Sequence, residues 1–206
     1  MTRAHQAIVA GLVSWLIAGS VAAESVPHTY MAPALAGIVT ETGTARPLVG
    51  VAILVRWAGV SRRTWEIAEA RTGPDGRFSV AGWGPRSLPE PIGVDSPQIF
   101  CYKAGYEFQP IGAGRCMPAG GPYVSELRRS AAPPQERAWE LQDFIVGLLL
   151  LPATLPQPTL PQMFGDARAE FLSLPAGAKA DQSLKEFDTD VRNPKLQPGL
   201  PYSFGH

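Results

Sequence analysis

Hydrophobic and polar positions alternate along several short segments of the chain, a pattern that predicts β-strands. In the range 49–57 the odd-numbered positions from Val51 to Trp57 are apolar and share one face of an extended strand. Ala52 and Leu54 make the opposite face apolar too, which is typical of a central strand of a sandwich. Further strands are predicted at 35–40, 65–72, 97–108 (ending in a turn around Gly105) and 123–129.

A tight turn is predicted at residues 73–76. Proline presets φ, the Asp75 side chain can bond to its own backbone, and Gly76 supplies a positive φ. Phe78 and Val80 then alternate with polar neighbours. This pattern predicts a β-hairpin whose second strand brings Phe78 into a core. Asp75 and Gly76 are therefore interpreted as turn residues and not as metal ligands or catalytic groups.

Other segments carry weaker patterns. Residues 24–33 predict an unstructured leader, and the Pro- and Gly-rich range 82–96 predicts a long loop. Residues 137–143 fit both a strand and a helix, and we favour the strand, followed by a short helix or apolar turn. The range 144–206 is Pro-rich and predicts a partly disordered C-terminal extension with short helices.

Four stretches together resemble the carboxypeptidase regulatory-like domain family. They are a Gly-x-Val strand, a Pro-Leu-x-Gly-Val strand, a Thr-x-x-x-Gly-x-Phe segment and a Gly-Tyr turn. The matching residues are Gly37, Val39, Pro47, Leu48, Gly50, Val51, Thr72, Gly76, Phe78, Gly105 and Tyr106. The resemblance covers 34–108 and implies a seven-stranded transthyretin-like (Ig-like) β-sandwich, which we expect to occupy 34–143. It also implies a bacterial exported protein.

Composition and charge narrow the class of partner. Lys and Arg total 18, as do Asp and Glu, so the formal net charge is zero. This balance argues against nucleic acid or an anionic membrane surface as the main partner. The 21 glycines and 21 prolines suit a chain of many short strands and turns better than a helical bundle.

The N-terminal segment has the features of a signal peptide. A basic start at Arg3 precedes an apolar run from Ala7 to Ala18, and small residues follow. We expect a signal peptide at 1–23, cleaved after Ala23, and a periplasmic or extracellular location. The run is shorter than the roughly twenty apolar residues of a membrane span, and no membrane span is expected in the mature chain.

Two cysteines, Cys101 and Cys116, lie in the mature part of the chain. An exported chain meets an oxidising compartment, so a disulfide between them is the favoured interpretation. Such a bridge would stabilise the fold by about 3 kcal/mol in the chain-entropy treatment. Two unpaired thiols, one of them buried in a strand, are the alternative.

No residue pattern of a known enzyme stands out. The mature chain has only His28 and His206, near its ends, and it lacks a Gly-x-Ser-x-Gly motif and phosphate-binding loops. The sequence therefore predicts no catalytic residue, metal site or cofactor. Trp83 lies in the predicted loop and is the candidate binding residue, because an exposed Trp can stack on a sugar or anchor a partner. Trp57, Trp65 and Trp139 are interpreted as core residues.

These observations favour a non-catalytic exported β-sandwich module that binds or scaffolds a protein in the envelope or outside the cell. A carbohydrate-binding accessory module with Trp83 at its mouth is the alternative, in which the partner is a glycan. A small enzyme is a third possibility, which would require a polar pocket with converging carboxylates.

Overall fold

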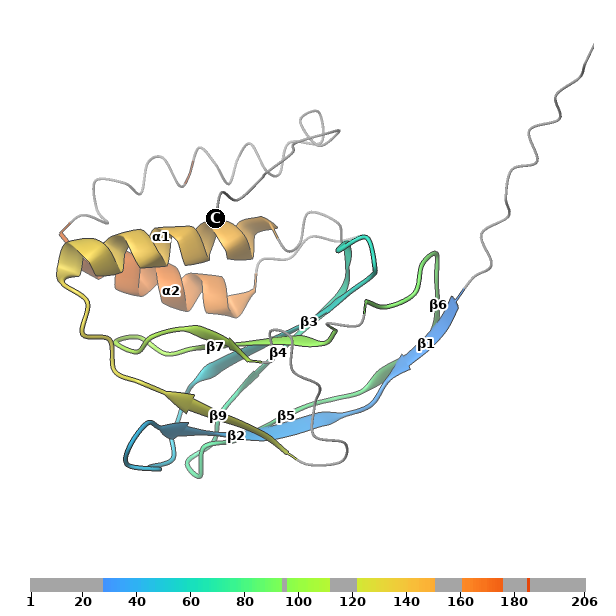
Figure 1. Cartoon of the computed structure of the whole chain (residues 1–206), viewed down its shortest axis with the longest axis horizontal. Helices are drawn as coiled ribbons and strands as arrows, with labels where there is room; N and C mark the ends of the chain where they lie inside the picture. The colour runs from blue at the N-terminus through green and yellow to red at the C-terminus, as the bar shows by residue number, and fades with distance from the viewer. Residues whose placement is uncertain (1–27, 94–95, 112–121, 151–160, 176–184, 186–206) are drawn as a thin grey trace, which may run out of the picture.

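A computed structural model of the chain describes residues 28–93, 96–111, 122–150, 161–175 and 185. These residues form mostly β-strands in several sheets, with two short helices (Figure 1). This content agrees with the predicted all-β class. The strands are β1 (His28–Ala32), β2 (Leu35–Glu41), β3 (Ala52–Ala58), β4 (Thr64–Arg71), β5 (Arg77–Val80), β6 (Trp83–Leu88), β7 (Gln98–Tyr102), β8 (Gln109–Ile111) and β9 (Tyr123–Leu127). The helices are α1 (Pro134–Leu150) and α2 (Gln162–Ser173).

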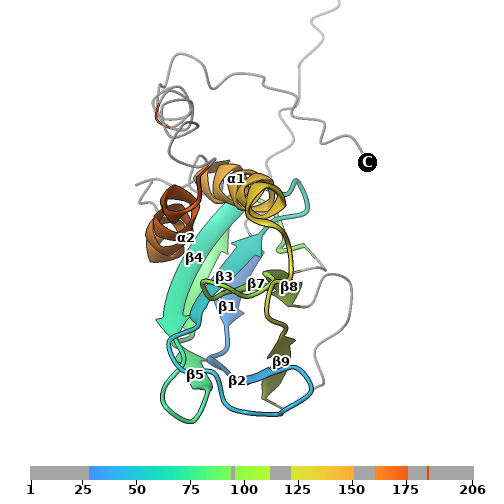
Figure 2. The same ribbon diagram turned by 90° about the vertical axis from the view of Figure 1, so that its left-hand side faces the viewer.

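Two sheets face each other across one apolar core (Figure 2). The first has the strand order β5-β2-β9, with β2 antiparallel to β5 and parallel to β9. The second has the order β4-β3-β7-β8 and is antiparallel throughout. Both sheets contribute buried side chains to the core between them, among them Val39, Ile53, Val55, Trp57, Phe78, Ile99 and Leu127.

Strand β3 is buried on both of its faces. Ile53 and Val55 point into the core between the sheets, as the alternation predicts. Ala52 and Leu54 point the other way, into a second apolar core that lies between the sheet and the helices. The outer face of this sheet is apolar at its central strand, so a further layer covers it and forms the second core.

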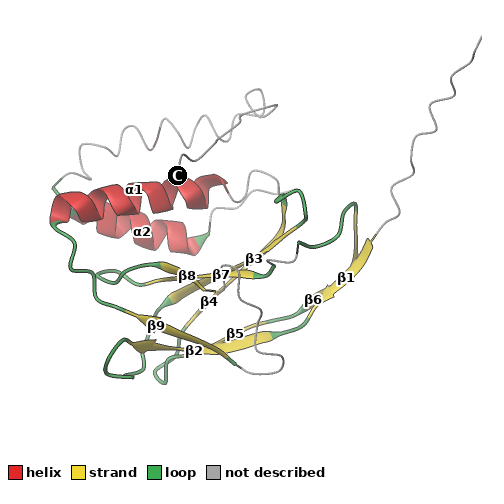
Figure 3. Ribbon diagram, viewed as in Figure 1, coloured by secondary structure: helices red, strands yellow, loops and turns green. Residues whose placement is uncertain are grey.

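Helices α1 and α2 are that layer, and they pack side by side on the outer face of the β4-β3-β7-β8 sheet (Figure 3). The strand predicted at 137–143 is wrong, since these residues lie inside α1. The apolar positions that fit helical spacing, Ala138, Leu141, Ile145 and Leu148, form the buried face of α1. The predicted boundary at residue 143 falls within this helix.

The turn at residues 73–76 forms as predicted. Gly76 has a φ of 74°, and Asp75 Oδ1 accepts a hydrogen bond from the Arg77 amide at 3.0 Å. A Cβ at Gly76 would lie 2.6 Å from the Val39 carbonyl oxygen, so the turn also needs glycine to dock against β2. Phe78 enters the core as expected, with 5% of its surface exposed.

The hairpin expected around this turn does not form. Strand β4 pairs with β3, and β5 pairs with β2, so the turn carries the chain from one sheet to the other. The local turn chemistry is the same for a hairpin and for a crossing between sheets. Only the partners of the two strands distinguish them, and those partners lie far away in the sequence.

Two strands appear where no strand was expected. β6 lies within the predicted loop at 82–96, and β1 lies within the predicted leader at 24–33. They pair antiparallel, with His28 opposite Leu88. This two-stranded ribbon continues β2 and β5 beyond the edge of the sandwich (Figure 1). Residues 24–27 lie outside the described residues.

We expect the helical layer to unfold together with the sandwich. Phe171 of α2 is 1% exposed in the second core, so Phe171→Ala should lower the free energy of unfolding by about 3–5 kcal/mol. The measurement is urea unfolding followed in parallel by far-ultraviolet circular dichroism and tryptophan fluorescence. Trp139→Ala is the control on α1, because Trp139 is 62% exposed and its loss should cost less than about 0.5 kcal/mol. Helical signal lost at lower urea than the fluorescence change would contradict the expectation.

Candidate functional site

Two neighbouring hollows flank the turn that follows β7, and they share Lys103 and Ala104. We call the larger one, about 490 Å³, the cationic groove; it is lined by Arg46, Pro47, Leu48, Val49, Lys103, Ala104, Tyr106 and Arg129. We call the smaller one, about 340 Å³, the helix-side hollow; it is lined by Gly50, Arg71, Tyr102, Lys103, Ala104, Asp166, Ala169 and Glu170.

The carboxylate of Glu41, at the end of β2, organises the cationic groove. It accepts hydrogen bonds from Tyr106 Oη at 3.0 Å and from Arg129 Nε at 2.9 Å. Arg46 Nη2 forms an ion pair with the same carboxylate at 2.9 Å. The hydrogen bond from Tyr106, followed by the two arginines, lowers the pKa of Glu41 despite its burial. Glu41 is therefore a fixed negative charge that holds both arginines in place.

Lys103 adds a positive charge that forms no ion pair with a carboxylate in the described part of the chain. Its Nζ donates to the Val49 carbonyl oxygen at 2.9 Å. The groove therefore carries three cationic side chains, Arg46, Lys103 and Arg129, over the one carboxylate of Glu41. The excess of positive charge is local, since the chain as a whole has no net charge.

The helix-side hollow is built around Glu170 of α2. Arg137 of α1 donates to its carboxylate from Nε at 2.9 Å and from Nη2 at 3.1 Å. Tyr102 Oη donates at 2.6 Å, and the Gly105 amide donates at 3.2 Å. Burial favours the neutral form, but these donors outweigh it and lower the pKa of Glu170. Burial, and then the neighbouring Glu170, raise the pKa of the Tyr102 hydroxyl.

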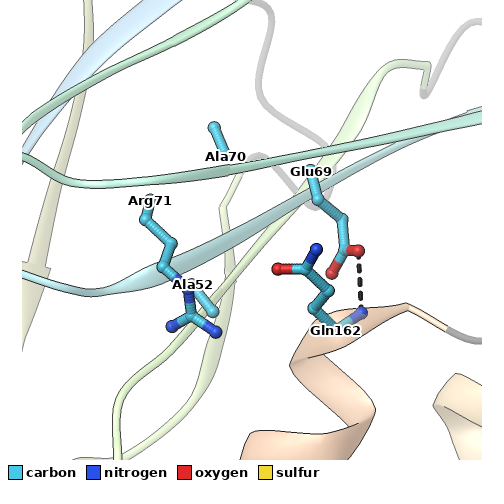
Figure 4. A pocket seen from close by; sticks show the side chains of 5 residues that line it. All are labelled: Ala52, Glu69, Ala70, Arg71 and Gln162. Atoms are coloured by element: carbon cyan, nitrogen blue, oxygen red, sulfur yellow. Dashed lines mark hydrogen bonds between the residues drawn. The ribbon is translucent and has the colours of Figure 1, made fainter.

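A third, smaller hollow of about 140 Å³ lies at the start of α2 (Figure 4). The Glu69 carboxylate of β4 accepts hydrogen bonds there from the backbone amides of Gln162 at 2.7 Å and Met163 at 3.0 Å. These amides are free donors at the N-terminus of any helix, and an anion would bind to them. Glu69 already occupies that position, so this hollow has a structural role in anchoring the helix.

Trp83 does not lie in a loop, so its predicted placement is wrong. It begins β6 and is half-buried. Its ring packs against Tyr30 at a centroid distance of 5.3 Å and against Trp57 at 5.7 Å, and Arg86 lies over it. Pairing of β6 with β1 turns the ring toward the sandwich core.

The other predicted tryptophans and the predicted disulfide have mixed outcomes. Trp57 is a core residue as expected. Trp65 is only half-buried and belongs to neither apolar core, and Trp139 is exposed because α1 turns it away from the sheet. Cys101 is a buried free thiol, so the structure does not contain the predicted bridge to Cys116, which lies outside the described residues. Burial raises the pKa of the Cys101 thiol to about 12, which makes it unreactive. Asp75 and Gly76 are turn residues, as predicted.

Neither hollow was predicted from the sequence. Arg129 carries no distinctive local motif, and Glu41 is 88 residues away from it. No local pattern connects them, because β2 and β9 become neighbours only when the sheet forms. Among the described residues, no group of His, Cys, Asp and Glu side chains could hold a metal ion.

The fold and the groove define a mostly β, sandwich-like protein with a helical layer on one face and a cationic groove at one end. No model of a known protein family matches the sequence, and no curated protein matches it. Within the described residues, neither helix is long and apolar enough to cross a bilayer.

The ion pair between Arg137 and Glu170 should make stability depend on pH. The Arg137 and Glu170 side chains are only 5% and 11% exposed, so Glu170→Gln should lower the free energy of unfolding at pH 7 by about 3 kcal/mol. The folded-state pKa of Glu170 is lowered, so its contribution is complete above the unfolded value of about 4.3 and is lost as pH falls through the folded value. The variant should show a flatter decline in acid.

Urea unfolding between pH 3 and pH 7 measures this effect. Asp166→Asn is the matched control on α2, because Asp166 pairs with Arg71 where both side chains are well exposed. It should change stability by less than about 1 kcal/mol. Equal effects of the two substitutions, or an unchanged acid profile in Glu170→Gln, would show that the buried pair does not anchor the helices.

Proposed function

We propose that this chain is a non-catalytic, exported β-sandwich module that binds a protein partner in the envelope or outside the cell, and that the cationic groove is its binding surface. The observation that carries this proposal is the groove itself. It is open, has exposed cationic side chains on its walls, and presents Val49, which is 54% exposed, beside the buried Leu48. Arginine is enriched in protein–protein interfaces relative to the rest of the surface, and two of the three cations that line the groove are arginines.

The state of the carboxylates supports binding rather than catalysis. A general acid or base works best with a pKa near the working pH. The pKa values of Glu41 and Glu170 are both lowered, and arginines hold both groups in the charged form. Glu41 and Glu170 are therefore poorly suited to proton transfer.

The resemblance to the carboxypeptidase regulatory-like family remains part of the proposal. Its matching residues from distant stretches contact one another. The Val39 amide donates to the Gly76 carbonyl oxygen at 2.9 Å, and Thr72 Oγ1 donates to the Leu48 carbonyl oxygen at 2.5 Å. The ring of Phe78 lies within 2.5 Å of the position of a Cβ on Gly37. One structural unit built from the family-like residues supports a common fold.

A seven-stranded transthyretin-like sandwich is the finer fold that we propose. The two facing sheets have three and four strands, and β1 with β6 forms a separate two-stranded sheet beside them. In this interpretation β1 and β6 are an addition to the family's sandwich, and α1 with α2 are a second one.

The carbohydrate-binding alternative rests on Trp83, and the structure offers it little support. The Trp83 ring contacts Tyr30, Trp57 and Arg86 and does not present an open platform. Trp139 is exposed, but none of the described aromatic contacts pairs it with a second ring. Sugar-binding surfaces rely on exposed aromatic faces, so a protein partner is favoured.

Export gives the first test of this proposal. The predicted signal peptide at 1–23 lies outside the described residues, and its cleavage is tested by expressing the full chain in a Gram-negative bacterium. Sequencing of the N-terminus of the periplasmic or secreted protein should give Glu24 as the first residue. Recovery of the full-length chain from the cytoplasm alone would be evidence against export.

Position-specific crosslinking gives the second test. A photoreactive phenylalanine analogue replaces Val49 in the groove or Val60 in the turn after β3; the two positions are 54% and 62% exposed. They flank opposite ends of β3, a strand about 20 Å long. Irradiation of exporting cells should give one adduct of defined mass from position 49 and none from position 60, and mass spectrometry identifies the crosslinked segment. Equal adducts from both positions, or none from position 49, would refute the groove as the binding surface.

A further inference from the structure

We propose that the cationic groove recognises an acidic, extended peptide segment, whose carboxylate groups bind between Arg46, Arg129 and Lys103. This inference rests on the proposed function, and it adds the chemical class of the ligand.

The two arginines keep donors for a ligand after they bind Glu41. A guanidinium group has five N–H donors, and Arg46 contacts Glu41 through Nη2 whereas Arg129 contacts it through Nε. Their side chains are 60% and 67% exposed. No other side-chain hydrogen bond of either arginine is found in the described part of the chain. Each can therefore offer further N–H groups to an incoming carboxylate.

Glu41 prepares this site before a ligand arrives. It holds two arginines from distant parts of the chain beside one another, and its own position is held by Tyr106. Arg129 also lies over the Tyr106 ring, with its guanidinium carbon 5.2 Å from the ring centroid. Groups held in place lose less conformational entropy on binding, so the arrangement favours an anion at the free side of the guanidinium groups.

Lys103 supplies a third donor from a different element, the turn after β7. Its contact with the Val49 carbonyl oxygen is on the exposed surface, so an ammonium group that has three donors can also bind a ligand there. Because Glu41 neutralises only one of the three cations, an anionic ligand gains a net attraction. An equivalent cationic ligand would be repelled.

The lining between the cations fits a peptide better than a sugar or a nucleic acid. It is aliphatic, formed by Pro47, Leu48 and Val49. The one aromatic lining residue, Tyr106, is 4% exposed and offers no face on which a sugar ring or a base could stack. Successive side chains of an extended peptide point to opposite sides, so a segment in which acidic and aliphatic residues alternate can direct its carboxylates to the cations and its aliphatic side chains to Pro47 and Val49.

The test is isothermal titration calorimetry of the mature full chain with a hexapeptide of alternating Glu and Val, capped at both ends. The same peptide with Gln in place of Glu is the ligand control. We expect measurable binding of the Glu peptide that weakens as salt rises, and at least tenfold weaker binding of the Gln peptide. Equal binding of the two peptides would overturn the proposal.

Lys103→Met and Lys103→Glu are the groove variants, since Lys103 is half-buried, its hydrogen bond to Val49 is on the surface, and it belongs to neither apolar core. Neutralisation should weaken binding of the Glu peptide about fivefold, and charge reversal should weaken it more than tenfold. Arg63→Met is the matched control, because it removes one positive charge in the turn at the other end of β3 and should leave affinity unchanged. Unchanged affinity in Lys103→Glu would overturn the proposal.

The two proposals fail in different ways. If position 49 still gives a specific crosslink but the Glu peptide does not bind, the groove is a binding surface and the acidic-peptide proposal is wrong. Binding of polygalacturonate or of a DNA oligonucleotide without binding of the Glu peptide would overturn it as well. If the Glu peptide binds but position 49 gives no crosslink in exporting cells, the groove can bind acidic peptides but is not the surface that binds the partner, and the proposed function is wrong.

Discussion

The apolar character of both faces of β3 determines the architecture. An antiparallel sheet commonly keeps one face in water, and its strands then alternate between apolar and polar residues. In β3, Leu54 and Val55 point to opposite faces and are both fully buried. Burial of a large aliphatic side chain stabilises a fold by about 1.5–3 kcal/mol, so the outer face of this sheet needs a cover. Helices α1 and α2 provide it, which makes the molecule three-layered.

Covering the sheet also fixes the place where the groove forms. Arg137 of α1 and Glu170 of α2 are buried together, and their contacts extend beyond the helices. The Gly105 amide donates to Glu170, and Arg137 donates to the Tyr106 carbonyl oxygen at 2.7 Å. Both contacts hold the backbone of the turn that follows β7. The same turn presents Lys103 to the groove, so the helical layer positions one wall of the candidate site.

The sequence predicts what is decided locally and misses what depends on distant partners. Alternation locates β2, β3 and β4, and turn chemistry locates Gly76 in its positive-φ position. The same turn chemistry cannot say that β4 and β5 belong to different sheets. The sequence around Leu141 fits both the two-residue period of a strand and the 3.6-residue period of a helix. It forms a helix, whose apolar face covers the outer face of the β4-β3-β7-β8 sheet. The sequences of β1 and β6 lack the alternation that predicts a strand, and the two segments form strands by pairing with each other.

The candidate site depends on partners that are distant in the sequence. Glu41 is separated from Tyr106 by 65 residues and from Arg129 by 88, so nothing in the neighbourhood of any one of them indicates the others. The zero net charge argued against nucleic acid or an anionic membrane surface as the main partner, yet it averages over the whole chain and does not reveal the three cations gathered at the groove. A binding surface needs only a local field, which falls off over a Debye length of about 8 Å in physiological salt. The distribution of charge on the folded surface, and not its sum, therefore selects the partner.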